Sequence, residues 1–267
     1  MIKLIDDIDL LDRLSEKEPY FGSLFTAAAV SFFDDPELLS IWIELDEKGR
    51  AHSFLNASSD SIMLFSPYGL PGTEMVMFAT NLISGGSIKN IECDENCFGV
   101  LKNLFDFDNE DAVQMVQKNR IDTQKNAFEI HYFENFDDAW KVTKTLFADE
   151  ADSVKDFWKL KMVRGVLKNQ STLLTLHDKA AVSTACIRGR PKNAGAITSV
   201  VTLPEHRHRG YASYLTALCS NMLIDEGREA WLVPASTDVR KMYEKLGFTA
   251  VKKYHYLYNI KEKEDIK

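Results

Sequence analysis

The pattern of apolar and polar residues divides the chain into two series of predicted helices and strands. Apolar residues at helical spacing predict helices, and alternation of apolar with polar residues predicts strands. The first series consists of two helices within 1–34, a hairpin around 47–49, strands over 61–66 and 87–93 with a helix over 73–83 between them, and a helix around 98–105. Glycines 85 and 86 provide the stop signal for the helix over 73–83.

A polar and acidic stretch, residues 105–125, follows the first series. We interpret it as a helix-bearing connector, because its apolar residues are few and are flanked by charged ones. It therefore marks the predicted domain boundary, with an N-terminal α+β domain over 1–126 and a second domain over 127–267.

The second series is longer and clearer than the first. It comprises a strand over 127–133, helices from Asn135 or Asp137 to Phe147 and from 152 or 153 to 167, strands over 171–176, 181–187 and 195–203, a helix over 210–226, a strand over 229–233, a helix over 237–246, and one or two closing strands. This order predicts an α/β fold with a mixed, mostly antiparallel sheet flanked by helices. The first half repeats the order in shortened form, so a degenerate internal duplication is plausible.

Composition narrows the class of protein. The 267 residues are 45% hydrophobic and 27% charged, and no apolar stretch approaches the roughly 20 residues of a membrane-spanning helix. A net charge of −8 disfavours general binding to nucleic acid or to an anionic membrane. The first residues do not resemble a secretory signal, and four scattered cysteines predict neither a disulfide scaffold nor a zinc site. We therefore expect a cytoplasmic protein without a metal.

The most informative segment is residues 199–219. A strand rich in β-branched residues ends at Pro204, four cationic or titratable side chains follow at 206–209, and Gly210 precedes an amphipathic helix. Free N–H groups at a helix N-terminus, the positive end of the helix dipole and nearby arginines together make an anion-binding site. The segment is not a P-loop, because no Lys-Ser or Lys-Thr follows the glycine, and it lacks the three glycines of a dinucleotide fingerprint.

These residues resemble the GNAT superfamily of N-acetyltransferases. The run Arg207-His208-Arg209-Gly210-Tyr211-Ala212 fits the family signature R/Q-x-x-G-x-G/A, and the preceding residues 200–204 fit its strand. Downstream, Tyr243 with Gly247-Phe248 resembles the recurrent Tyr-x-x-x-Gly-Phe stretch of the family. The resemblance covers residues 127–258 and looks closest to the branch that includes the C-terminal domains of glycine N-acyltransferases. The first half would then be a smaller, possibly degenerate GNAT-like unit.

The resemblance implies acetyl-CoA as co-substrate and a role for each matching residue. Backbone N–H groups of 208–213 would hold the pyrophosphate, the edge of the strand at 200–202 would bind the pantetheine arm, and Tyr243 would protonate the departing thiolate. Ser236 stands where the family often has an asparagine that binds pantetheine. The implied cofactor-binding set is Val200, Val201, Thr202, Arg207, His208, Arg209, Gly210, Tyr211, Ala212, Ser213 and Ser236.

The function that follows is transfer of an acetyl group to a primary amine of a small molecule or peptide. Transfer of a longer acyl chain is the alternative within enzymes, and a non-catalytic acyl-CoA-binding module is the alternative outside them. Ser236 and the lack of a distinguished general base favour the module, whereas Tyr243 favours the enzyme. Three residues, Glu129, His131 and Glu150, could serve as base, but their spacing singles out none of them.

The acceptor is less determined than the donor. The net negative charge slightly favours a cationic acceptor such as a polyamine or lysine. The first half has no counterpart of the anion loop, because residues 67–75 contain neither Arg nor Lys. We therefore expect it to bind no cofactor and either to shape the acceptor side or merely to cover a face of the sheet.

Overall fold

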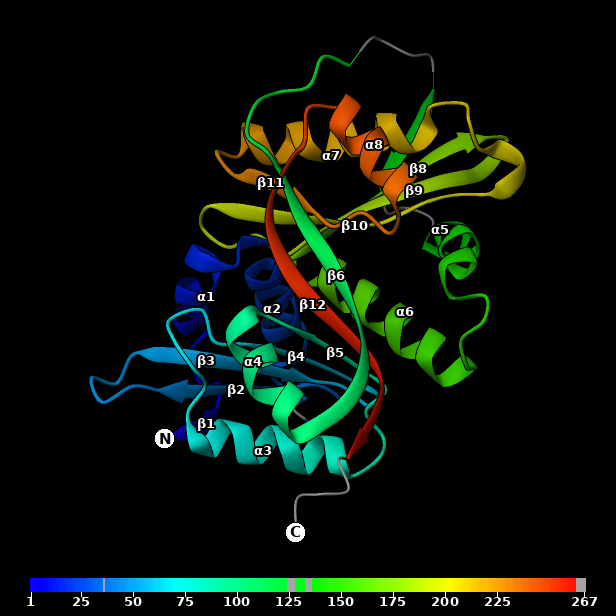
Figure 1. Ribbon diagram of the computed structural model, residues 1–267. Coiled ribbons are helices and arrows are strands. Elements are labelled where there is room, and N and C mark those ends of the chain that lie inside the picture. Colours follow the sequence, from blue (N-terminus) through cyan, green and yellow to red (C-terminus); the bar gives the residue numbers. More distant parts are fainter. Residues whose placement is uncertain (36, 124–127, 133–135, 263–267) are drawn as a thin grey trace.

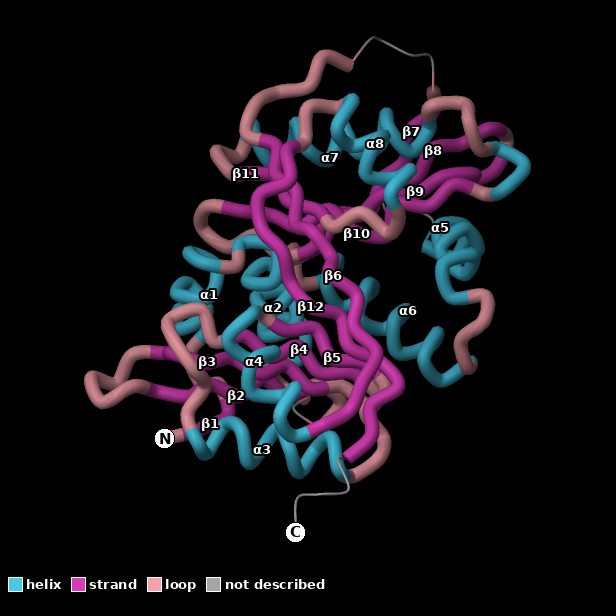
Figure 2. Tube along the Cα trace, viewed as in Figure 1, coloured by secondary structure: helices cyan, strands magenta, loops and turns pink. Residues whose placement is uncertain are grey.

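The twelve strands in the described part of the chain form one continuous sheet with helices on both faces (Figures 1 and 2). The computed structural model describes residues 1–35, 37–123, 128–132 and 136–262. The strand order is β1-β2-β3-β4-β5-β12-β6-β11-β10-β9-β8-β7, and neighbouring strands are antiparallel except for β4 with β5 and β10 with β11. This confirms the predicted α/β class with its mostly antiparallel sheet.

Each half contributes one series of elements in the same order. The first half contains β1 (Ile2–Leu4), a 3-10 turn (Ile8–Leu11), α1 (Asp12–Lys17), α2 (Pro19–Phe32), β2 (Ser40–Leu45), β3 (Ala51–Ala57), β4 (Ser61–Phe65), α3 (Thr73–Ser84), β5 (Asn90–Cys93), α4 (Glu95–Leu104) and β6 (Phe105–Gln117). The second contains β7 (Glu129–Tyr132), α5 (Phe136–Thr143), the 3-10 turn η2 (Lys144–Phe147), α6 (Asp152–Leu167), β8 (Ser171–Asp178), β9 (Ala180–Arg188), β10 (Ala194–Thr202), the 3-10 turn η3 (Pro204–His206), α7 (Tyr211–Asp225), β11 (Glu229–Leu232), α8 (Thr237–Lys245) and β12 (Thr249–Glu262). The repetition of the whole order fits two GNAT-like halves.

The predicted connector is the main error of the sequence analysis. Residues 105–117 form the long strand β6 and not a helix. Antiparallel pairing with β12, from Thr249↔Val116 to Glu262↔Phe105, supplies the backbone partners that stabilise this polar segment as a strand. The short strand β1 was also not predicted. Asn135 and both ends of the predicted strand over 127–133 lie outside the described residues.

The sixth strand of each half completes the sheet of the other half. β6, which follows α4 in the first half, pairs with β11 of the second half through residues 115–117. β12, which closes the second half, pairs with β5 of the first through residues 255–258. The two strands cross the middle of the molecule side by side (Figure 1). A domain division at residue 126 stays a prediction, but the sheet itself continues across it.

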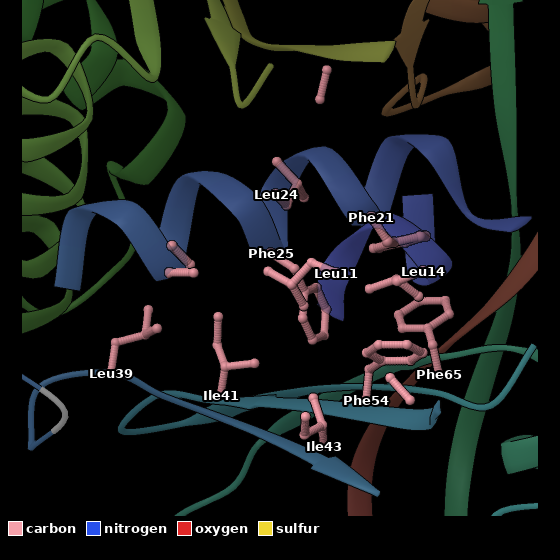
Figure 3. Close-up of a cluster of buried hydrophobic side chains, with 14 of the residues drawn as sticks. Leu11, Leu14, Phe21, Leu24, Phe25, Leu39, Ile41, Ile43, Phe54 and Phe65 are labelled. Atoms are coloured by element: carbon pink, nitrogen blue, oxygen red, sulfur yellow. The ribbon is translucent and has the colours of Figure 1, made fainter. Parts of the chain in front are cut away.

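Helix α2 joins the two halves through its buried side chains. Phe21 and Phe25 pack on the rings and aliphatic chains of β2–β4, including Phe54 and Phe65 (Figure 3). The same cluster reaches Ala196 on β10 of the second half. At about 25 cal/mol per Å² of buried apolar surface, such a cluster is a major source of stability. Because α2 packs on strands of both halves, it fixes their relative position.

Two faces of the sheet are covered by different helices. On one face, α3 and α4 contribute to the apolar cluster of the first half and α7 to that of the second. On the opposite face lie α2 and α6, which pack against each other through Phe32 and Phe157, 6.0 Å between ring centroids. In the described part of the chain, no helix has the length and hydropathy needed to cross a membrane.

Candidate active site

The site is built where two parallel strands separate. β10 pairs with β11 only at residues 194–196 and then continues to Thr202 with β9 as its partner on the opposite edge. A bulge lies in this free stretch, because Ser199 has a φ of 53° and the pairing with β9 shifts register between Thr198 and Val201. The carbonyl oxygens of Ser199 and Val201 accept hydrogen bonds from Thr184 and Ser183 of β9, both 2.9 Å. The other edge of β10 therefore faces the space opened by its separation from β11.

The turn after β10 brings the helix N-terminus to this space. His208 and Gly210 both adopt left-handed backbone conformations, with φ of 61° and 81°. Gly210 is the N-cap of α7, and no side chain caps the helix there. The first N–H groups of α7, at residues 211–213, have no intrahelical acceptors and are available to an anion. A Cβ built on Gly210 would meet nothing within 4 Å, so the approach to these groups is open.

A cleft of about 820 Å³ connects these features. Its volume is typical of pockets that bind small molecules. It is lined by Thr145, Leu146, Val200, Val201, Thr202, His206, Arg207, His208, Gly210, Tyr211, Ala212, Ser213, Ala235, Asp238, Val239, Met242 and Tyr243. The structure thus gathers in one cleft ten of the twelve site residues expected from the sequence.

Arg209 and Ser236 are the two expected residues that do not line the cleft. The Arg209 guanidinium lies 3.8 Å from the Asp178 carboxylate and also reaches the carbonyl of Glu205. The Ser236 hydroxyl caps α8 by accepting a hydrogen bond from the Val239 N–H, 3.3 Å. Both side chains therefore have partners within the protein, and their contacts with a cofactor stay predictions.

A hydrogen bond to Thr202 holds the side chain of Arg207 against the end of β10. Its Nε donates to the Thr202 carbonyl oxygen at 3.2 Å, which leaves the terminal nitrogens of the guanidinium for other acceptors. His206 and Arg209 both lie near Asp178, 3.9 and 3.8 Å away, so the positive charge of the turn is partly neutralised on that side. Arg207 is the cation of this turn that lines the cleft without such a carboxylate among the described residues.

Tyr243 forms part of the cleft wall and is nearly buried. Its side chain is 4% exposed, packs near Phe248 and belongs to the apolar cluster that contains Tyr211 and Leu215. Burial raises the pKa of the Tyr243 phenol well above its usual range. The phenol is therefore protonated at neutral pH and can act as a proton donor to a group in the cleft.

The cleft also includes residues that the sequence analysis missed. Val239 precedes Tyr243 by four positions on α8, so helical spacing would have placed it on the same face, and Met242 follows Val239 by three positions. Thr145 and Leu146 come from η2, whose position depends on packing that no local pattern reveals. The three candidate bases of the sequence analysis do not line the cleft: Glu129 contacts His131 at 2.8 Å on β7, and Glu150 is exposed after η2.

The corresponding place in the first half is filled by the protein itself. The buried Glu44 carboxylate accepts a hydrogen bond from the Gly72 N–H at 2.9 Å, at the N-terminus of α3. A Cβ on Gly72 would collide with that carboxylate. β4 also stays paired with β5 as far as Leu64↔Cys93, and the Ser66 N–H donates to Asp94. An internal carboxylate thus takes the position that the open N-terminus of α7 leaves free in the second half.

Comparisons with known proteins concern the fold and one matched segment. The FR47-like family model matches residues 174–257, which span β8 to β12 and include the turn and Tyr243. No curated protein matches the sequence. A tandem GNAT protein from the clavulanic acid biosynthesis pathway superimposes with a TM-score of 0.63 at 10% identity, and the match covers 98% of each chain.

Two other solved structures are also similar to this chain in fold. A Drosophila protein has a TM-score of 0.63 at 14% identity, with 96% of this chain and 97% of that chain covered. A GCN5-related N-acetyltransferase from Kribbella flavida has a TM-score of 0.58 at 11% identity, with 78% of this chain and 86% of that chain covered. At these identities the likeness concerns the fold. The chain therefore has the tandem GNAT fold, with an FR47-like segment in the half that carries the cleft.

Proposed function

We propose that the protein is an acetyl-CoA-dependent N-acetyltransferase that acts on a primary amine. One observation carries this proposal: the open N-terminus of α7, the free edge of β10 and the buried phenol of Tyr243 line the same cleft. This combination offers an anion site for the pyrophosphate, backbone groups for the pantetheine arm and a proton donor for the thiolate. The GNAT fold of both halves supports the proposal.

The donor would be held mainly by backbone groups. The N–H groups of 211–213 and the guanidinium of Arg207 would contact the pyrophosphate oxygens. The edge of β10 at 200–202 would hydrogen-bond the amides of pantetheine as an added strand does. Gly210 leaves room for this approach because it has no side chain.

The chemical step needs no covalent enzyme intermediate. The neutral amine attacks the thioester carbonyl, a C–N bond forms, the C–S bond breaks, and the thiolate takes the phenolic proton of Tyr243. A backbone N–H of β10 at the bulge would polarise the carbonyl oxygen as negative charge develops on it. The attacking nitrogen loses one proton to solvent or to a nearby base, and the Tyr243 phenolate takes up a proton from solvent before the next turnover.

The chain length of the acyl group and the subfamily are finer parts of the same proposal. We favour acetyl over longer chains, and we favour the glycine N-acyltransferase-like branch because of the run 207–212 and the Tyr243 stretch. A non-catalytic acyl-CoA-binding module is the alternative outside enzymes. Tyr243 argues against the module, since a purely binding protein has no use for a proton donor in the cleft wall.

A thiol-release assay tests the proposal. Purified protein is incubated with acetyl-CoA and a panel of primary amines, and free thiol is measured with a chromogenic disulfide while calorimetry measures binding of coenzyme A. Binding together with amine-dependent thiol release is the expected result. Binding without release for any amine would support the module, and a preference for hexanoyl-CoA would support the longer acyl chain.

A further inference from the structure

A second cavity lies between the two halves, on the face of the sheet covered by α2 and α6. It has a volume of about 210 Å³ and is more enclosed than the cleft. Its walls come from α2, β3, β4 and β5 of the first half and from η2, α6, β9 and β10 of the second. The cavity therefore exists only because both halves are present.

Two buried cations line this cavity. Arg188 at the end of β9 is 6% exposed, and Lys161 on α6 is 9% exposed. In the described part of the chain neither forms an ion pair with a carboxylate within 4 Å, although aromatic rings lie beside both. The Arg188 guanidinium carbon lies 5.4 Å from the Trp158 ring centroid, and the Lys161 Nζ lies 4.9 Å from the same ring.

The hydrogen-bonding capacity of the cavity wall is also unfilled. The Nε of Arg188 and the Oγ1 of Thr198 are buried atoms without a hydrogen-bond partner among the residues that the structure describes, and both residues line the cavity. A buried guanidinium that lacks both a counter-ion and a partner for Nε is costly, since buried charges are ordinarily paired. An anionic ligand would supply both.

The cavity and the cleft meet at β10. Thr198 and Ser199 line the cavity, whereas the next residues, 200–202, line the cleft. Leu146 of η2 lines both. A molecule in the cavity would therefore reach the bulge of β10, which is the place where the thioester of the donor is expected.

We propose that the cavity is the acceptor site and that it takes a small primary amine that also carries an anionic group, which Arg188 and Lys161 hold while the amine points towards the β10 bulge. This inference rests on the proposed function for the identity of the reacting group. Carboxylate, sulfonate and phosphate share the chemistry that Arg188 recognises. The overall charge of −8 favours a cationic acceptor, but the local charge of the cavity favours an anionic group, and binding depends on the local one.

Glu92 adds a carboxyl group to the cavity that Arg188 and Lys161 also line. It lies on β5 between Ile91 and Cys93, which point to the other face, so its carboxyl faces the cavity. Burial raises the pKa of Glu92 to about 7, an effect that Tyr254 and Lys161 partly offset. Burial and the neighbouring Arg188 lower the pKa of Lys161 to about 7, and the carboxylates of Asp60 and Glu92 oppose this. Glu92 can therefore accept a proton from the bound ammonium, which leaves the neutral amine that attacks the thioester.

Ligand binding provides the test, because it does not require turnover. Calorimetry with coenzyme A present would compare β-alanine, taurine and O-phosphoethanolamine with n-propylamine, which has the amine but no anionic group. We expect at least one of the three anionic amines to bind at least tenfold more tightly than n-propylamine. The amine that binds most tightly shows which anionic group the cavity prefers.

Variants assign the binding to the cavity. Arg188→Gln should weaken binding of the anionic amine at least tenfold while coenzyme A affinity stays unchanged, and Arg188→Lys should restore part of it. Arg190→Gln is the matched control, because Arg190 lies two residues further on and pairs with Glu226 outside the cavity. Lys161→Met replaces Arg188→Gln if that variant does not fold.

The outcomes separate this inference from the proposed function. Anionic amines that bind through Arg188 without being acetylated would uphold the site and overturn the enzyme. Acetylation of n-propylamine or spermidine as good as that of the anionic amines, and unaffected by Arg188→Gln, would uphold the enzyme and overturn this site. Failure of all three anionic amines to bind the wild-type protein would also overturn it.

Discussion

The Nε of Arg207 donates a hydrogen bond to the carbonyl oxygen of Thr202, 3.2 Å away, across the turn that joins β10 to α7. This bond fixes the guanidinium beside the strand that leads into the cleft. The neighbouring Arg209 is directed to Asp178 instead. Two arginines that are nearly adjacent in the sequence are thus expected to contribute unequally to phosphate binding.

Arg207→Ala should therefore weaken coenzyme A binding by about 1.5–3 kcal/mol, the usual effect of losing a hydrogen bond to a charged group. Arg209→Ala is the matched control and should weaken it less. Calorimetric titration of both variants measures the difference. Equal losses in the two variants would contradict the assignment.

Gly210→Val should abolish coenzyme A binding while the fold persists. The added side chain occupies the approach to the N–H groups of α7, and a β-branched residue is strained at a φ of 81°. Gly227→Val is the control, because Gly227 has a φ of 75° and open space around it but lies at the other end of α7. Both variants should lose similar stability in thermal unfolding, and only the first should lose binding.

Tyr243→Phe should lower turnover on the order of 10²–10⁴-fold and leave acetyl-CoA affinity almost unchanged. The hydroxyl meets the sulfur only as charge develops there, so ground-state binding senses it little. Tyr214→Phe serves as the control, because Tyr214 lies on α7 near the site but packs against Phe128. Steady-state kinetics measures the turnover and titration measures the acetyl-CoA affinity of the same samples. An equal loss of both in Tyr243→Phe would contradict the role of proton donor.

Ser236→Ala should destabilise the protein by about 1 kcal/mol, because it removes the N-cap of α8. Urea unfolding measures this loss. Ser236→Asn keeps a capping side chain and should retain most of the stability. A fall in coenzyme A affinity in the alanine variant, beyond that caused by unfolding, would show that Ser236 also contacts the pantetheine arm.

Glu92→Gln should become increasingly stabilising as the pH rises from about 5 to 8. The folded-state pKa of Glu92 is raised to about 7, so the stability contributed by its protonated form is present at low pH and is lost as the pH rises through 7. The shift from 4.5 to about 7 sets an upper bound of about 3 kcal/mol on this change.

Unfolding midpoints of wild type and variant at several pH values provide the measurement. Glu74→Gln is the control and should show a difference from wild type that does not change over this range, because hydrogen bonds from the backbone of Ile2 and from the N-terminus lower the pKa of Glu74, which is therefore charged in both states above pH 5. If the difference in unfolding midpoint between Glu92→Gln and wild type does not change with pH, Glu92 is charged throughout this range.

Most of the residues that the sequence suggested for the site line the cleft of the second half, because their sequence signals are local. Gly210 needs a positive φ, the cationic turn precedes it directly, and Tyr243 belongs to a short motif on one helix. The acceptor cavity had no such signal. Arg188, Lys161 and Glu92 come from β9, α6 and β5, and only the packing of α2 and α6 against the sheet brings them together.

The strand β6 was mistaken for a helix for a related reason. Alternation is limited to Phe105 and Phe107 with Asp106 between them, and residues 108–111 are polar and exposed, so the apolar alternation of a strand does not continue through the segment. Their strand conformation depends on β12, more than a hundred residues later, which supplies the hydrogen-bond partners. A pattern read within a short window does not contain that information.

The exchange of β6 and β12 has a consequence for biosynthesis. β5 is made early, yet its partner β12 is the last of the described strands to leave the ribosome. Throughout synthesis of the second half, the nascent first half therefore exposes a sheet edge, the kind of surface on which unwanted strands pair. Both halves reach their final sheet at the same late moment, and a truncated chain that ends before residue 249 would leave both unfinished.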